Sequence, residues 1–462
     1  MTSTTDGYAR GPWRAWLTVV GAFLMQFSVV GFMSAFGVMQ AYYVQTFLSH
    51  SSVSAISWIG SIQTLLDLTL GAFLGPFLDR GYLRHVVIGG STIFVICHFM
   101  LSLAKPEKYY QVILSQGIGM GLGIGSIFLP TSVLISQHFK RRKALAMGIV
   151  PAGGSLGAVA FSIALNYLLN GSLGFGWSIR VTAFICLSLL LVGNLLLFDP
   201  KPAKDDMPAQ DMQEKPPDAI GAVSEGADEK ELDAHAEHDD AAPPPFLDRE
   251  YVCILVQGFL MGLGFWFPSS YVQLFAEQKG VDQQLSFYTI AILNVANALG
   301  RIVPNWLGDR WGALEVYVPC LLINSGLQFA LLGCSTPYGL VLFTIFYGFF
   351  SGAVVSLYLP VVASISTEGA NVGKRMGIAL FPAGIASLIG TPIGGALIGH
   401  DYVWWKGVVF AAVSRSDWAG WRYCHSVHST GSAAQVMISY LLDSLSSPPK
   451  YCYWPIKLVD KL

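Results

Sequence analysis

The run Gly75-Pro-Phe-Leu-Asp79-Arg80-Gly81 decides the fold, because its acidic–basic pair returns 230 residues later as Gly308-Asp309-Arg310-Trp-Gly312. Two more pairs of runs share nearly the same offset. They are Ser126-Ile-Phe-Leu-Pro130 with Ser356-Leu-Tyr-Leu-Pro360, and Met147-Gly-Ile-Val-Pro-Ala-Gly153 with Met376-Gly-Ile-Ala-Leu-Phe-Pro382-Ala-Gly384. Several matching runs in one order at one offset indicate that the chain consists of two similar halves.

The composition around these runs is that of a membrane protein. Of the 462 residues, 53% are hydrophobic and only 12% are charged, whereas a soluble domain carries roughly 25% charged residues. This excludes a soluble multidomain enzyme and a disordered protein. The seven cysteines form no CxxC pair and no metal-binding spacing, so we interpret them as buried thiols.

A bilayer crossing needs about 20 mostly apolar helical residues, and eleven stretches meet that need. They are 15–44, 53–78, 85–104, 110–137, 144–169, 178–199, 251–274, 287–307, 314–335, 338–366 and 376–399. A twelfth begins at Tyr402 and breaks after Val413, too early to cross. The repeat offset covers six helices and a linker, so both halves enter the membrane from the same side. The sequence therefore predicts an all-α membrane protein with two parallel six-helix repeats and an incomplete twelfth helix.

Charge distribution sets the expected domains and orientation. Short connections on one side hold nine basic residues and those on the other hold four, so the positive-inside rule places the N-terminus in the cytoplasm. Residues 201–245 carry four Lys against 13 Asp and Glu, a composition that cannot build a core. We expect five parts: a cytoplasmic N-terminus (1–14), a six-helix bundle (15–199), an acidic disordered cytoplasmic linker (200–250), a second bundle (251–413) and an atypical tail (414–462).

The loop after the second span resembles the signature loop of the major facilitator superfamily. Within that superfamily the chain resembles the fungal branch of the monocarboxylate porter family, over roughly residues 6–413. The matches are Asp6-Gly7, Trp16, Gly21-Ala-Phe23, Phe36-Gly37-Val38, Tyr42-Tyr43, Phe139-Lys-Arg-Arg142, Ala144, Gly148 and Gly300-Arg301. The resemblance implies a transporter that works by alternating access.

The repeated Asp-Arg pairs are candidates for gating residues. A carboxylate at a helix end can accept from backbone N–H groups, or from a guanidinium, across the interface between the halves. Asp79, Arg80, Asp309 and Arg310 would then hold one access state and release it. The other interpretation is a solvated turn whose charges only set topology.

Ionisable residues inside spans are candidates for solute binding, because each costs about 2.5–3.5 kcal/mol at a helix centre unless it is paired or hydrated. Asp67 lies midway along the second span and Arg301 inside the eighth; the repeat offset maps Asp67 onto Asn297. Arg301 is suited to bind an anion through its planar fork, and the resemblance implies that it pairs with a substrate carboxylate. Alternatively, Arg301 snorkels to the membrane surface and Asp67 is a packed, protonated acid.

The chain departs from animal relatives at Asn297, where they carry an acidic residue that relays a proton. Asp67 is then the best remaining proton carrier.

We expect a secondary active transporter of a small organic, anionic solute, with or without a co-transported proton, in the plasma membrane. Monocarboxylate uptake and efflux of a fungal secondary metabolite both stay open, as do a transporter-like receptor and a defective transporter. No enzyme activity, cofactor, metal or nucleic acid is expected, and Asn170 begins the one glycosylation sequon, in an outside loop.

Overall fold

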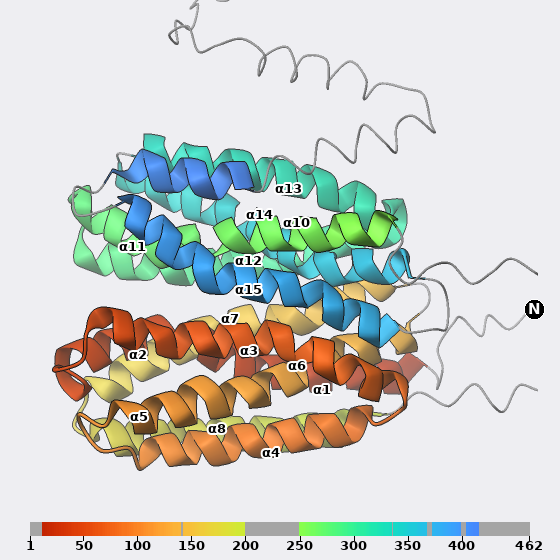
Figure 1. Ribbon diagram of the computed structural model, residues 1–462, viewed down its shortest axis with the longest axis horizontal. Helices are drawn as coiled ribbons and strands as arrows, with labels where there is room; N and C mark the ends of the chain where they lie inside the picture. The colour runs from red at the N-terminus through yellow and green to blue at the C-terminus, as the bar shows by residue number, and fades with distance from the viewer. Residues whose placement is uncertain are drawn as a thin grey trace, which may run out of the picture.

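The computed structural model describes residues 12–139, 142–198, 249–334, 336–366, 372–398 and 403–414. The described elements are helices, arranged as two bundles that lie one against the other (Figure 1). The parallel two-bundle fold expected from the repeat is therefore confirmed.

The N-terminal half makes six crossings. Its elements are α1 (Pro12–Ser34), α2 (Phe36–Tyr42), η1 (Tyr43–Phe47), α3 (Val53–Asp79), α4 (Leu83–Ser102), α5 (Tyr109–Val112), η2 (Ile113–Met120), α6 (Gly121–His138), α7 (Lys143–Leu169) and α8 (Gly174–Leu196). The α1–α2–η1 run forms the first crossing and the α5–η2–α6 run forms the fourth.

The C-terminal half repeats this order. Its elements are α10 (Arg249–Phe265), α11 (Phe267–Gln278), α12 (Gln283–Trp311), α13 (Ala313–Ala330), η4 (Leu331–Gly333), α14 (Pro337–Ser364) and α15 (Val372–Ile398). A further helix over 404–414 begins the twelfth crossing. The break between α10 and α11 occurs beside Pro268, whose ring cannot continue a helix interior without loss of a hydrogen bond. The expected acidic linker falls mostly on 199–248 and the expected tail mostly on 415–462, both outside the described residues.

One crossing is more polar than its neighbours. Among the described residues, ten helical segments are long and apolar enough to cross a membrane. The α12 helix is 29 residues long but is not one of the ten, because polar residues interrupt it. They are Asn294, Asn297, Arg301, Asn305, Asp309 and Arg310. Since α12 packs along α14 in the second bundle, we treat it as the eighth crossing, with its polar residues in protein contacts.

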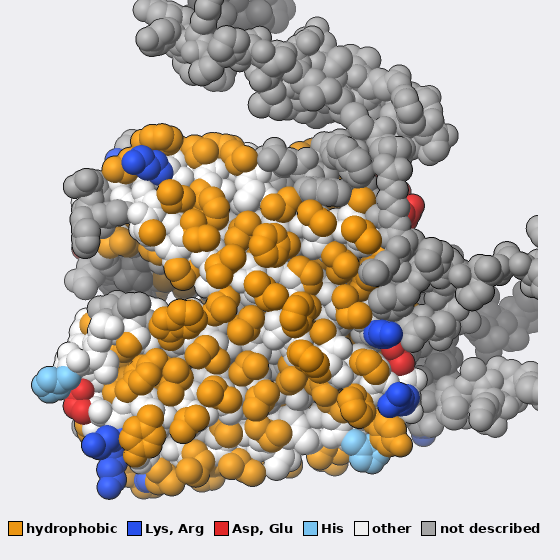
Figure 2. All heavy atoms as spheres, in the orientation of Figure 1, with side chains coloured by type: hydrophobic (Ala, Val, Ile, Leu, Met, Phe, Trp, Pro, Cys, Tyr) orange, Lys and Arg blue, Asp and Glu red, His pale blue; other side chains and the backbone are white. Residues whose placement is uncertain are grey.

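The outer surface is apolar between two charged ends. Figure 2 shows hydrophobic side chains covering the visible face, with Lys, Arg, Asp and Glu gathered towards the left and right edges. Large apolar side chains such as Phe73, Leu195 and Tyr338 are exposed on the bundle. Such a surface is what hydrocarbon tails of lipid would cover.

Glycines bring helices into backbone contact inside the first bundle. A Cβ atom at Gly157 of α7 would overlap the carbonyl oxygen of Phe27 on α1. By contrast, a Cβ at Gly326 of α13 would meet no atom within 4 Å.

We therefore expect Gly157→Ala to destabilise the protein by about 1–3 kcal/mol, the usual cost of overpacking. Gly326→Ala is the matched control and should leave stability unchanged or slightly higher, because Ala favours helix. Thermal unfolding of the purified variants in detergent measures both. Equal midpoints for the two variants would show that the α1–α7 contact tolerates an added methyl group.

The two halves meet along two helix pairs, α3 with α15 and α7 with α12. On the first pair, glycines Gly71 and Gly377 lie backbone to backbone. On the second, a Cβ at Gly148 would overlap the Arg301 carbonyl oxygen. These pairs bring the repeated Asp-Arg loops and the intramembrane arginine to one interface.

Candidate functional site

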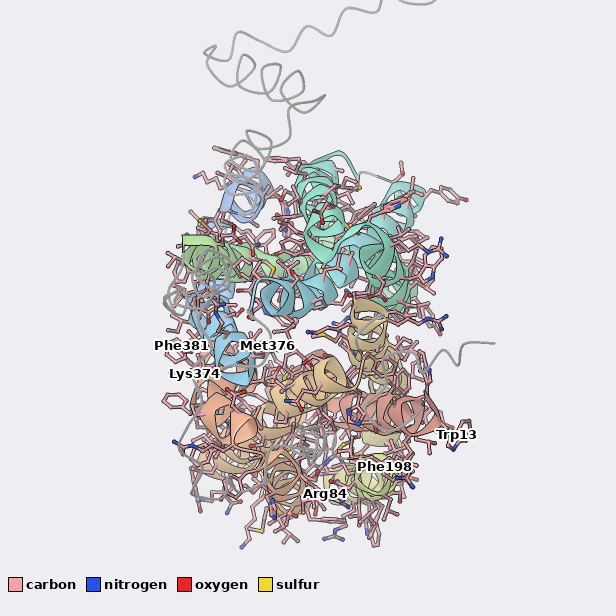
Figure 3. The ribbon with its side chains drawn as sticks, turned by 90° about the vertical axis from the view of Figure 1, so that its right-hand side faces the viewer. Trp13, Arg84, Phe198, Lys374, Met376 and Phe381 are labelled. Carbon is pink, nitrogen blue, oxygen red and sulfur yellow. The ribbon has the colours of Figure 1, made fainter. Side chains whose placement is uncertain are left out.

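Asp79 joins the two halves at the end of α3. Its Oδ1 accepts from the backbone N–H of Gly373 at 2.9 Å, and its Oδ2 accepts from that of Lys374 at 2.9 Å. Both N–H groups lie in the first turn of α15, where helix N–H groups have no partner within the helix. The carboxylate thus caps a helix of the opposite half. Figure 3 looks onto this end of the protein, with Lys374 where α15 meets the N-terminal half.

Asp309 makes the equivalent contact from the second half. Its Oδ1 accepts from Ala144 N at 2.8 Å and its Oδ2 from Leu145 N at 2.9 Å, at the start of α7. We call these contacts the Asp79 clasp and the Asp309 clasp, and the end of the protein that holds them the clasp end. A carboxylate at a helix N-terminus also interacts favourably with the helix dipole. The two clasps therefore join the halves by the same chemistry, in each direction.

The glycines of the repeated loops have a backbone role beside the clasps. Gly81 has φ of 87° and Gly312 has φ of 102°, in the region that side chains with a Cβ rarely adopt. Each glycine lets the chain turn directly after the helix that carries the clasp aspartate, which is α3 or α12. The turn keeps the carboxylate near the end of that helix. The pattern of a glycine after the Asp-Arg pair in both halves follows from this turn.

The arginines of the two loops lie outside the clasp contacts. Arg80 is exposed at the end of α3. Arg310 is also exposed and lies over the Trp306 ring, 4.0 Å from its centroid. The sequence allowed either a guanidinium or backbone N–H groups as donors to the two aspartates. The structure uses backbone N–H groups. The residues that supply them were not identified from the sequence.

Arg301 lies in the interface between α12 and α7. Its Nε donates to Asn297 Oδ1 at 2.8 Å, and its Nη1 donates to the carbonyl oxygen of Pro151 at 2.7 Å. Pro151 belongs to α7, so the guanidinium bonds to both halves. The side chain is half-buried and is held by protein acceptors.

Asn297 organises the groups around Arg301. Its Oδ1 also accepts from Ser155 Oγ of α7 at 2.8 Å, while its Nδ2 donates to Ser351 Oγ of α14 at 3.0 Å. The amide therefore links three helices from both halves. Sequence reasoning singled out Asn297 but missed Ser155 and Ser351, because serines are too common inside the predicted spans to mark a site.

Asp67 faces this cluster from the first half. It is 4% exposed, and it interacts electrostatically with Arg301. The two described side chains form no direct ion pair, and Asp67 Oδ1 is buried without a hydrogen-bond partner among the described residues. One turn earlier, both amide atoms of Gln63 are in the same state. Buried polar atoms normally have partners, so this region can accept the polar groups of a bound molecule.

Asn170 lies apart from these residues. It is exposed at the end of α7, and its Nδ2 donates to Asn166 Oδ1 at 2.9 Å. Its modification stays a prediction. The site thus consists of two layers: the clasps at one end, and the Asp67–Arg301–Asn297 cluster inside the spans.

Comparisons with known proteins agree with this architecture. The family model described as Major Facilitator Superfamily matches residues 17–313 and 254–414. The MFS-type transporter dbaD of Emericella nidulans is 34% identical over 411 residues, which cover 88% of this chain and 82% of that protein. The Aspyridones efflux protein apdF of the same organism is 31% identical over 394 residues, covering 85% and 74%. The Agnestins efflux protein AgnL12 of Paecilomyces divaricatus is 34% identical over 385 residues, covering 83% and 81%.

Solved structures share the fold at low sequence identity. The proton:xylose symporter XylE aligns with a TM-score of 0.67 at 13% identity, covering 89% of this chain and 96% of that one. FucP in the outward conformation aligns with a TM-score of 0.61 at 14% identity, covering 88% and 98%.

Proposed function

Because the chain belongs to the major facilitator superfamily, and is a transporter and not an enzyme, we propose that it exports an organic anion made by fungal secondary metabolism. Two similar proteins carry names of this kind, efflux proteins for aspyridones and for agnestins. These names support export of a metabolite over uptake of a nutrient monocarboxylate.

The observation that carries the proposal is Arg301. It lies inside a crossing, bonded to groups of both halves, with the Asp67 carboxylate nearby on the opposite half. A guanidinium stays charged and binds carboxylates through a planar fork. An anion held there would lie between the halves, where a rocking transporter needs its solute. Asn297 is assigned to the same site because its Oδ1 holds Arg301.

In this proposal the two clasps control alternating access, because they close one end of the protein when formed and open it when broken. The clasp end is the cytoplasmic end, since the basic loops lie there and the N-terminus starts on that side. In this proposal, the cytoplasmic path is closed while both clasps are formed. Breaking the bonds of Asp79 and Asp309 opens it.

Asp67 gives the transporter a route to proton coupling. Its carboxyl is buried, and its Oδ1 lacks a hydrogen-bond partner among the described residues. A carboxyl in this setting gains or loses a proton with a change in hydration. We assign Asp67 to contact with a donor group of the solute or with a coupling proton.

Within the superfamily we place the chain in the fungal branch of the monocarboxylate porter family. The support is the set of residues shared with that family, including Gly300-Arg301 and Phe36-Gly37-Val38. The plasma membrane is the proposed location, because export from a cell requires it.

Metabolite profiling tests the proposal directly. Deleting the gene should cause an acidic metabolite to accumulate inside cells and to fall in the medium. Restoring the parent gene should reverse both changes, whereas an Arg301→Gln gene should restore neither. Identical inner and outer metabolite pools with and without the gene would contradict an export function.

A further inference from the structure

Arg301 is already occupied by protein in the clasp-closed state. Two of its three guanidinium nitrogens donate to protein acceptors, Nε to Asn297 and Nη1 to Pro151. An anionic solute that binds Arg301 must therefore bind beside these acceptors or replace one of them.

The Pro151 acceptor depends on close packing of α7 on α12. Gly148, one turn before Pro151, lies so near α12 that a Cβ there would overlap the Arg301 carbonyl oxygen. Ser155, one turn after, donates to Asn297. These contacts extend along one face of α7, and the Asp309 clasp fixes the beginning of that helix on α12.

All these contacts break together when α7 leaves α12. When α7 moves as one body, opening at Ala144 carries Gly148, Pro151 and Ser155 away from α12. The Arg301 Nη1 then loses its protein acceptor, whereas Asn297 stays because it belongs to the same helix as Arg301.

We propose that α7 is a built-in competitor for the solute anion: the Pro151 carbonyl engages Arg301 while the clasp end is closed and frees it when the clasp end opens. An organic anion then binds more tightly to the open state than to the closed state. This inference rests on the proposed function, because it takes Arg301 as the anion site. Tight binding from the cytoplasm and weak binding on the outer side suit release in an exporter.

Equilibrium dialysis of radiolabelled benzoate with the purified full-length protein tests the inference. Asp309→Asn weakens the clasp, and Gly148→Ala separates α7 from α12 at the level of Arg301. Both variants should bind benzoate about tenfold more tightly than the parent, the size expected when one charged hydrogen bond is released. Glu315→Gln and Gly326→Ala are the matched controls, since Glu315 is exposed at the clasp end and shows no bond to the other half among the described residues. Both controls should bind as the parent does.

The outcomes separate this inference from the function on which it rests. Equal or weaker benzoate binding in Asp309→Asn, with binding lost in Arg301→Gln, would overturn the competition by α7 and leave the anion site intact. Benzoate binding that is undetectable in parent and variants, or unaffected by Arg301→Gln, would overturn the anion site itself. If Gly148→Ala does not fold, the benzoate affinity of Asp309→Asn alone decides whether α7 competes with the anion.

Discussion

Replacing Arg301 by Gln should abolish anion transport while the protein still reaches the cell surface. Glutamine can replace the hydrogen bond to Asn297 or the one to Pro151, but it has no charge for a carboxylate. In the proposed site, Arg301 pairs with the carboxylate of the solute. Truncating one partner of a buried charge pair costs about 2–5 kcal/mol, so transport should fall at least about thirtyfold.

The matched control for this variant is Arg180→Gln. Arg180 also lies within a crossing, in α8, where its guanidinium stacks over the Trp177 ring at 5.0 Å from the centroid. Surface labelling and initial transport rates of both variants give the comparison. Near-parental rates for Arg180→Gln with loss in Arg301→Gln are expected; unchanged kinetics in Arg301→Gln would remove it from solute binding.

The fold was predictable because its signals are large and local. Apolar stretches of spanning length mark most crossings without knowledge of tertiary contacts, and the Asp79-Arg80 and Asp309-Arg310 pairs align the halves. The eighth crossing shows the limit of this logic. Polar residues make α12 less apolar than its neighbours. Four of them bond to α7 or α14 in place of lipid: Asn297, Arg301, Asn305 and Asp309.

The groups that hydrogen-bond to the charged site residues were harder to predict from the sequence than the charged residues themselves. Arg301 and Asp67 are conspicuous because a charge is costly inside a span. The Pro151 carbonyl and the N–H groups of Gly373 and Ala144 carry no sequence signal, since every residue has a backbone. Which backbone group becomes an acceptor or a donor across the interface depends on how the halves pack, and that packing is a property of the whole fold.

Breaking the clasps should shift the protein towards a state that is open at the clasp end. Asn in place of Asp keeps one acceptor oxygen but loses the second acceptor and the charge that favours a helix N-terminus. The two clasps hold different helix pairs, so their effects should add.

The two clasps should differ in strength. Asp79 is exposed, so solvent screens its interaction with α15, whereas Asp309 is half-buried. We expect Asp309→Asn to raise the ratio of open to closed protein about tenfold and Asp79→Asn about two- to threefold, within the usual range for a lost cap. The double variant should exceed either single variant.

Distances between spin labels at Tyr82 and Trp311 measure this ratio. Both side chains are exposed at the clasp end, one on each half, so a longer distance reports separation of the halves. The labels require a background in which the seven native cysteines are replaced. Glu315→Gln changes a carboxyl at the same end and should leave the distances unchanged.

Added salt should weaken the Asp79 clasp more than the Asp309 clasp, because salt screens exposed charges first. A parental distance distribution in the double variant would show that these carboxylates cap helices without holding the halves together.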